Sequence, residues 1–138
     1  MGGPGTEPGQ FMNPGGIHVD AQGTLWVAEF GNNRITKFSP EGEVLLIFGS
    51  TGGAPGQFNE ANAVTIDDAG RINVTEFQGS RVQVFDPEGN FLYMWGSRGP
   101  GQGQFTNPGM STVDNQGNIY VTDSEGRLIQ KFRLLEVS

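Results

Sequence analysis

Short apolar runs, each closed by turn residues, follow one another along the whole chain. In the first repeat unit they cover residues 16–20, 24–29, 34–39 and 43–48. Glycine, proline, asparagine or aspartate separates each run from the next, as at Asp20-Ala21-Gln22-Gly23. Runs of about four to eight residues with such boundaries are typical of β-strands joined by tight turns. The pattern predicts an antiparallel sheet, and no segment shows sustained helical periodicity.

This pattern occurs three times at a spacing of 47 residues, and Gly9, Gly56 and Gly103 open the three copies. The later copies predict strands at residues 63–67, 71–76, 81–86, 90–95, 110–114, 118–123 and 127–134. A fixed period of about 20–50 residues indicates a repeat architecture. We therefore expect a single domain over residues 1–138, with repeats at about 9–55, 56–102 and 103–138.

A sheet of this kind cannot bury both of its faces alone. Sheets stacked face to face around an axis, as in a β-propeller, solve that problem. The predicted fold class is all-β: a propeller with three blades of three to four antiparallel strands per chain. The third repeat has no counterpart of residues 43–48, and Met1–Pro8 aligns with glycine-rich loops that contain no strand. One outer strand is therefore missing.

Composition narrows the classes of function. The chain has 15 acidic and 8 basic residues and a net charge of −7, which disfavours binding to nucleic-acid phosphates. It has no cysteine, which excludes disulfides and thiolate metal sites. No apolar run approaches the roughly 18 residues that span a membrane, and Met1–Gly5 lacks the basic and apolar regions of a signal peptide. We expect no nucleic-acid partner, no membrane partner and no cofactor, and localisation is not indicated.

The motifs of the repeat, taken together, resemble the NHL repeat. Residues 9–49 carry the best match, in Gly9-Gln10-Phe11, Val27-Ala28-Glu29 and Gly31-Asn32-Asn33-Arg34-Ile35, the last in the place of the Asn-His-Leu signature. The resemblance implies a six-bladed propeller. Propellers of this family and its relatives serve as sensor domains of bacterial kinases, as RNA- or protein-binding domains of ubiquitin ligases, and as lyases and lactonases. The chain departs from the family at Glu29 and Glu76, where Asp is common, and at Arg127, which is shifted by one position.

Carboxylates recur at two positions of the repeat. One follows the first strand each time: Asp20, Asp67 and Asp114. These could form a metal ring, but a carboxylate that accepts hydrogen bonds within a turn is the favoured interpretation. A second carboxylate ends the second strand: Glu29, Glu76 and Asp123. Glu29 and Glu76 could face a ligand or pair with Arg34 and Arg81 of their own repeats, and the ion pairs are favoured.

We expect ligand contacts on one rim of the ring and in its channel. His18 is the only histidine and lies on the innermost strand, where it could act as a base or a ligand, or simply be packed. Phe30 and Phe77 lie at turns and could either contact a partner or cover blade edges. The candidate binding residues are His18, Glu29, Phe30, Asn32, Asn62, Glu76, Phe77, Gln78, Asp123 and Glu125. No catalytic residue and no metal ligand is assigned.

The favoured function is a non-enzymatic binding or scaffold module with a protein or small-molecule ligand on one rim. The rim with Phe30, Asn32, Phe77, Gln78 and Glu125 is preferred, because its loops vary between repeats. One alternative is a metal-dependent lyase or lactonase with its site in the channel, and another is RNA binding. A third is an engineered or excised fragment without a function of its own. We lean against an enzyme, because no nucleophile elbow or phosphate loop is present in the sequence.

Three repeats fill half of a six-bladed ring, so we expect a homodimer that closes the ring. Without a partner, two blade faces would be bare. The residues expected on them are Ile17, Val19, Leu25 and Val27 at one end and Val113, Tyr120, Val121 and Ile129 at the other. Three chains would give nine blades, more than the usual four to eight or so. The missing outer strand would be supplied by Met1–Pro8 or be absent, and absence is favoured.

Overall fold

The chain folds into three antiparallel sheets, one for each repeat. The computed structural model describes residues 2–125 and 127–133. Blade 1 consists of β1 (Pro14–Val19), β2 (Leu25–Glu29), β3 (Arg34–Phe38) and β4 (Val44–Phe48). Blade 2 consists of β7 (Ala61–Ile66), β8 (Ile72–Glu76), β9 (Arg81–Phe85) and β10 (Phe91–Trp95). Blade 3 consists of β13 (Pro108–Val113), β14 (Asn118–Asp123) and β15 (Leu128–Arg133).

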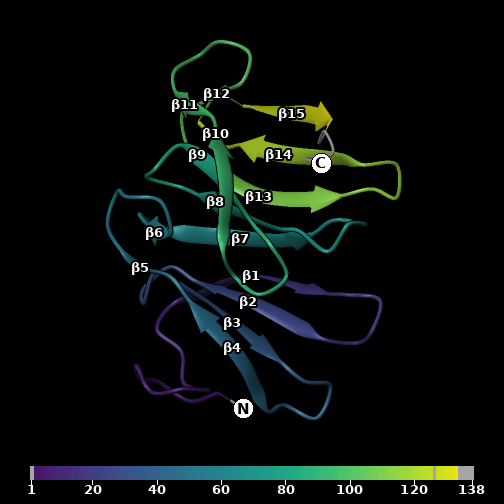
Figure 1. Cartoon of the computed structure of the whole chain (residues 1–138). Helices are drawn as coiled ribbons and strands as arrows, with labels where there is room; N and C mark the ends of the chain where they lie inside the picture. Colours follow the sequence, from purple (N-terminus) through teal and green to yellow (C-terminus); the bar gives the residue numbers. More distant parts are fainter. Residues whose placement is uncertain (1, 126, 134–138) are drawn as a thin grey trace.

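The three blades are stacked one on another, as Figure 1 shows. Strands follow the chain order within each blade, and the first strands lie together, with β7 between β1 and β13. The prediction of an all-β fold with four, four and three strands is confirmed. The described residues contain no helix, and hence none that is long and apolar enough to cross a membrane. Residues 134–138, where the fourth strand of the third repeat was predicted to be missing, lie outside the described residues.

Short parallel pairings connect the blades, and the sequence patterns did not predict them. They are β5 (Ser50–Thr51) with β6 (Gln57–Phe58), and β11 (Ser97–Arg98) with β12 (Gln104–Phe105). Pro4 and Phe11 form an isolated parallel bridge ahead of blade 1. Residues 2–8 contain no strand, as predicted. Two-residue strands are too short for a period-2 pattern to reveal.

The N-terminal segment is held by the arginine of blade 1. Arg34 Nη1 donates to the carbonyl of Thr6 at 2.7 Å, and Arg34 Nη2 donates to the carbonyl of Gln10 at 2.9 Å. Arg81 holds Gly53 and Gln57 in the same way ahead of blade 2. Residues 2–10 are therefore part of blade 1 and not available as an outer strand for blade 3.

Aromatic side chains from the end of each complete blade pack into the next blade. The ring of Phe48, the last residue of β4, lies 4.9 Å from that of Phe85 in blade 2. Trp95, the last residue of β10, lies 4.4 Å from Phe132 in blade 3. Aliphatic residues fill the rest of the two interfaces, so the core lies between the blades and not within any one of them.

The free faces of the stack differ in part from the prediction. Ile17, Val19 and Ile129 are exposed by 63%, 60% and 69%, as expected for bare faces. Val121 is fully buried, because it points to the opposite side of β14 and packs between blades 2 and 3. Val27 is also buried, on the side where Phe11 packs on Phe38. Val121 was therefore wrongly placed on a bare face, and so was Val113, which packs against the same cluster between blades 2 and 3. Val27 does lie on the free face of blade 1, paired with Ile17, but it is buried there.

Candidate functional site

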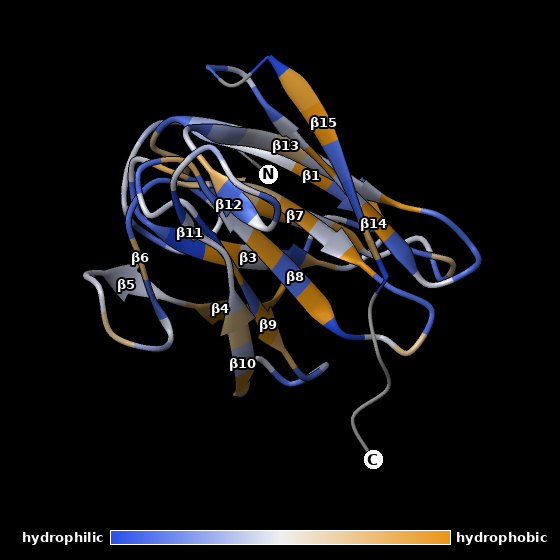
Figure 2. Cartoon of the chain, turned by 90° about the horizontal axis from the view of Figure 1, so that it is seen from above, coloured by the Kyte–Doolittle hydropathy of each residue, from blue (hydrophilic) through white to orange (hydrophobic). Residues whose placement is uncertain are grey.

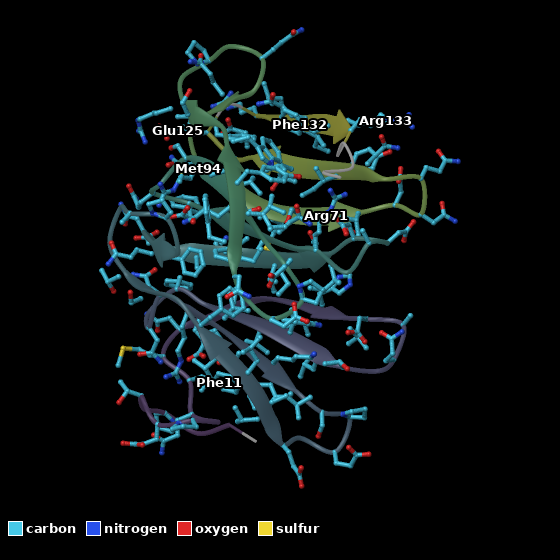
Figure 3. The ribbon with its side chains drawn as sticks, viewed as in Figure 1. Phe11, Arg71, Met94, Glu125, Phe132 and Arg133 are labelled. Atoms are coloured by element: carbon cyan, nitrogen blue, oxygen red, sulfur yellow. The ribbon has the colours of Figure 1, made fainter. Side chains whose placement is uncertain are left out.

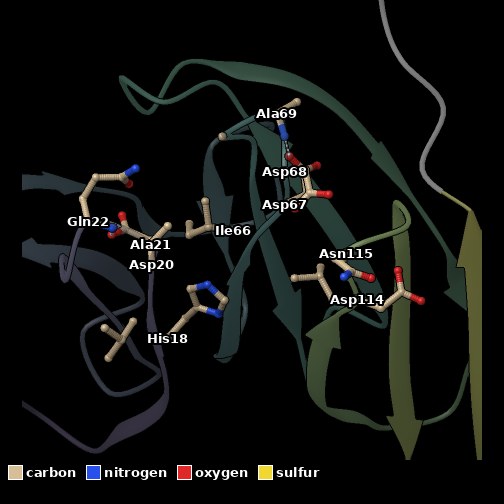
Figure 4. A pocket seen from close by; sticks show the side chains of 13 residues that line it. His18, Asp20, Ala21, Gln22, Ile66, Asp67, Asp68, Ala69, Asp114 and Asn115 are labelled. Atoms are coloured by element: carbon tan, nitrogen blue, oxygen red, sulfur yellow. Dashed lines mark hydrogen bonds between the residues drawn. The ribbon is translucent and has the colours of Figure 1, made fainter.

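A pocket of about 580 Å³ lies where three equivalent turns meet, as Figure 4 shows. Each turn joins the first strand of a blade to the second strand. Residues 18–22 of blade 1, 66–70 of blade 2 and 113–115 of blade 3 line the pocket. These turns belong to the rim opposite the one preferred from the sequence, and His18 is the only predicted binding residue in the lining.

Each turn is shaped by the carboxylate that follows the first strand. Its Oδ1 accepts two backbone N–H groups, from the residues two and four positions further on. For Asp67 these bonds come from Ala69 at 3.0 Å and Arg71 at 2.9 Å. Asp20 and Asp114 accept equivalent pairs. The interpretation as turn-forming carboxylates is confirmed, and the three turns place their side chains around one opening.

The second oxygen of each carboxylate is also bonded within its own blade. Asp20 Oδ2 accepts from Trp26 Nε1 at 3.1 Å, and Asp67 Oδ2 forms an ion pair with Arg71 Nε at 2.9 Å. Asp114 Oδ2 accepts from Asn118 Nδ2 at 2.9 Å and from the Tyr120 hydroxyl at 3.1 Å. The three carboxylates thus act first as structural groups.

Hydrogen bonds keep two of these carboxyl groups ionised. The side-chain and backbone hydrogen bonds from Asn118, with those from Gln116 and Tyr120, lower the pKa of Asp114 from 3.8 to about 2. Burial raises the pKa of Asp20, but hydrogen bonds from Trp26, Thr24 and Gln22 outweigh burial, and its pKa is lowered. The pocket therefore presents fixed negative charge at neutral pH.

His18 is the one titratable base in the pocket lining. It is half-buried on β1, opposite Trp26 of β2. Burial lowers the pKa of His18 below its ordinary value of 6.5, and the nearby charge of Asp20 opposes this effect. The imidazole is therefore mainly neutral at pH 7, and it can donate and accept one hydrogen bond each.

The carboxylates at the ends of the second strands lie elsewhere and serve their own blades. Glu29 is fully buried and pairs with Arg34 Nε at 2.8 Å, while Glu76 is fully buried and pairs with Arg81 Nε at 2.5 Å. The predicted ion pairs are confirmed. Asp123 accepts backbone N–H groups from Thr106 and Asn107.

The remaining predicted residues are spread over several environments. Asn32 Nδ2 donates to Glu29 Oε1 at 2.9 Å, and Asn62 Nδ2 donates to the carbonyl of Gly109 at 2.8 Å. Glu125 accepts from Asn107 Nδ2. The last three are Phe30 and Phe77, which are half-buried, and Gln78, which is exposed. Within the described part of the chain, no cluster of three or more His, Cys, Asp or Glu residues could hold a metal ion.

Asn33 is a structural residue that the sequence reasoning missed. Its buried Oδ1 accepts the backbone N–H groups of Glu60 and Ala61, which lie at the start of blade 2. Its φ of 49° lies in the left-handed region, as do those of Ser80 and Arg127 at the equivalent turns. Asparagine adopts this region more readily than most residues, and that was the available signal.

The turn-forming role of Asp114 can be tested by pH. Its folded-state pKa lies below its unfolded value, so its contribution is complete above about pH 4 and is lost as the pH falls through about 2. We expect Asp114→Asn, which cannot ionise, to flatten the fall in the free energy of unfolding over this range. Urea unfolding monitored by Trp fluorescence at each pH measures the effect.

Asp68→Asn is the matched control, because Asp68 is an exposed neighbour in the same rim. This variant should keep the wild-type acid dependence. An unchanged acid dependence of Asp114→Asn would contradict the structural role of Asp114.

Comparisons with known proteins support the fold. A structural genomics protein of unknown function from Bacteroides thetaiotaomicron superposes with a TM-score of 0.69 and 18% identity, over 86% of this chain and 34% of that one. Virginiamycin B lyase from Staphylococcus aureus superposes with a TM-score of 0.61 and 19% identity, over 90% of this chain and 42% of that one. A streptogramin B lyase structure superposes with a TM-score of 0.61 and 18% identity, over 86% of this chain and 39% of that one.

The chain spans less than half the length of these proteins, and identities of this size show the fold alone. None of the curated proteins matches the chain. Residues 11–38 match the family model of the NHL repeat, which agrees with the resemblance seen in the sequence. The chain thus contains an NHL repeat within an all-β fold that matches propeller-like proteins.

Proposed function

We propose that the protein is a non-enzymatic propeller module that binds a ligand or partner protein and works as a six-bladed ring of two chains. The observation that carries the proposal is the residue content of the two free blade faces. The side chains on those faces resemble, at equivalent repeat positions, the side chains that form the interface between blades 1 and 2.

The interface between blades 1 and 2 provides the template. On the blade 1 side, Trp26 packs in the core with Lys37 Nζ 4.8 Å from its ring centroid. On the blade 2 side, Val64, Ile72 and Val74 pack in the same cluster. An aromatic–lysine pair thus meets a surface of branched aliphatic residues.

The free faces carry the two halves of this template. The free face of blade 3 has Tyr120 with Lys131 Nζ 5.7 Å from its ring centroid, at the positions of Trp26 and Lys37. The free face of blade 1 has Ile17 and Leu25 at the positions of Val64 and Ile72. Blade 3 of one chain therefore fits blade 1 of a second chain. Closed two-fold assemblies bury both free faces at once and are the commonest oligomers.

The buried acidic groups support a binding role over an enzymatic one. Glu29 and Glu76, the carboxylates that could have faced a ligand, are fully buried and ion-paired within their blades. The pocket at the three turns offers His18 and the turn carboxylates to a ligand. The rim with Phe30 and Phe77 remains a predicted second surface for a partner.

A lyase is the alternative function, and the position of His18 favours it. This histidine faces the pocket, and the solved structures similar to the chain include virginiamycin B lyase, one structure of which contains Quinupristin. A lyase would need additional groups that act with His18. Asp68 and Asn115, which line the same pocket, are candidates.

The proposed two-chain ring predicts the molecular mass of the protein in solution. Light scattering at micromolar concentration should give twice the 14.8 kDa of the chain, because each chain leaves two apolar faces exposed. A well-folded monomer, or a trimer, would contradict the ring.

Two variants separate the junction from other exposed apolar positions. Ile129→Asp places a charge on the free face of blade 3 and should halve the measured mass or unfold the chain. Leu92→Asp changes a residue that is 41% exposed on the middle blade and should leave the mass unchanged. Equal behaviour of the two variants would show that Ile129 does not lie at a junction.

Incubation with Quinupristin tests the lyase alternative. We expect chromatography to show no conversion beyond that of a buffer control, and no difference between the wild-type protein and His18→Ala. Conversion that requires His18 would replace the non-enzymatic proposal with the lyase.

A further inference from the structure

The outer edge of β15 is open in the described structure. In blade 1, β3 pairs with β4, and in blade 2, β9 pairs with β10. β15 pairs with β14 on one side, and no described strand pairs with its other side. An open edge presents a row of N–H and C=O groups that can bind another strand.

A pocket of about 430 Å³ lies along this part of β15, between Gln102-Gly103 and residues 130–132. In blade 1, the fourth strand borders the equivalent space, because a β-carbon built on Gly9, the counterpart of Gly103, would lie 3.7 Å from Val44 Cγ2 in β4. At Gly56 of blade 2 and at Gly103 a β-carbon would meet no atom within 4 Å. The pocket therefore lies beside the place that a fourth strand takes in blade 1.

The side chain of Phe132 lacks the cover that its counterparts have. Phe85 is 1% exposed, and its ring lies 6.0 Å from that of Phe91, the first residue of β10. Phe38 is fully buried, and Val44, the first residue of β4, lies opposite it. Phe132, labelled in Figure 3, is only half-buried. An apolar residue at the start of an added strand would cover it.

The charge along β15 also differs from the charge along β3 and β9, the equivalent strands of blades 1 and 2. Lys131 and Arg133 are exposed, in a chain whose net charge is −7. Arg133 stands at the position of Ser39 and Asp86. Figure 2 shows β15 at the edge of the molecule, with both apolar and polar residues along it. Since an antiparallel strand begins opposite the end of its neighbour, an acidic residue just before an added strand would lie near Arg133.

We propose that β15 binds an extended segment of a separate partner polypeptide, which joins blade 3 as its fourth strand. The segment has the character of Val44–Phe48 and Phe91–Trp95: consecutive aliphatic and aromatic residues that end in an aromatic residue. An acidic residue precedes it, as Glu43 precedes β4. Backbone hydrogen bonds supply the affinity, and the pocket and the Phe132 ring supply the selectivity.

This site belongs to one chain and does not depend on closure of the ring. The edge, the pocket and Phe132 are all formed by residues 102–133. The segment 2–10 of the same chain is bound to Arg34 in blade 1 and does not pair with this edge.

A synthetic peptide with the sequence of residues 39–49, which contains β4 and its acidic flank, is the probe. Labelled at its N-terminus, it should bind the full chain saturably in a fluorescence anisotropy titration. Hydrogen exchange followed by mass spectrometry should show new protection at residues 128–133 and none in β1. Absence of saturable binding up to millimolar concentration, or protection confined to another blade, would overturn the proposal.

Two methylated peptides provide the matched controls. One carries N-methyl groups at Leu46 and Phe48, and the other carries one at Ile47, because the pairing of β4 with β3 is regular over Leu46–Phe48 and shifts register before Leu46. Only one of the two sets of N–H groups faces β15, because neighbouring N–H groups of a strand point to opposite sides. One peptide should bind about tenfold more weakly or worse, while the other binds like the parent.

Equal binding of the two methylated peptides would overturn strand addition. The mass of the protein, measured in the same samples, separates this proposal from the ring. A monomer that binds the peptide at β15 would contradict the ring alone, and a dimer that does not bind it would contradict the peptide site alone.

Discussion

A sheet with two apolar faces must be covered on both sides, and this requirement governs the structure. Blade 2 satisfies it, since blades 1 and 3 flank it and β8 is buried along its whole length. Blades 1 and 3 each have one neighbour, and their free faces leave Ile17 and Ile129 more than half exposed. The hydrophobic gain thus lies between blades, and a further blade face is the surface that best completes each end.

Polar groups inside each blade fix the geometry on which this stacking depends. The turn carboxylates hold the first two strands of every blade, and Glu29 and Glu76 join the second strand to the arginine of the third. Removing one partner of a buried ion pair leaves an uncompensated charge, which costs about 3–5 kcal/mol. These acidic residues are therefore needed for the blade itself. His18 and the exposed parts of the turns, in contrast, line the pocket and are not part of these ion pairs.

Local patterns in the sequence were sufficient to predict the blades. Alternation and turn residues located the strands to within one or two residues, and the spacing of Glu29 from Arg34 predicted their ion pair. Features that depend on how blades meet were not predicted. The side chain of Asn33 binds the backbone of the next blade, 27 residues away at Glu60, and the pocket forms where three separate turns converge. The prediction that Val121 lies on a bare face was wrong for a related reason, because the alternation along β14 separates Val121 from Tyr120 but does not tell which of the two sides meets blade 2.

Disulfide cross-linking across the junction tests the central claim, that blade 3 of one chain packs on blade 1 of another. Thr75 Oγ1 lies 3.2 Å from Ser111 Oγ between blades 2 and 3, and Thr122 and Ile17 are the counterparts of these residues on the free faces. The chain has no cysteine, so Ile17→Cys with Thr122→Cys introduces the only thiols. After mild oxidation, this double variant should give one band at twice the chain mass on a non-reducing gel, while each single variant stays at the chain mass. A double variant that remains at the chain mass, or that forms a ladder of higher oligomers, would contradict the closed two-chain ring.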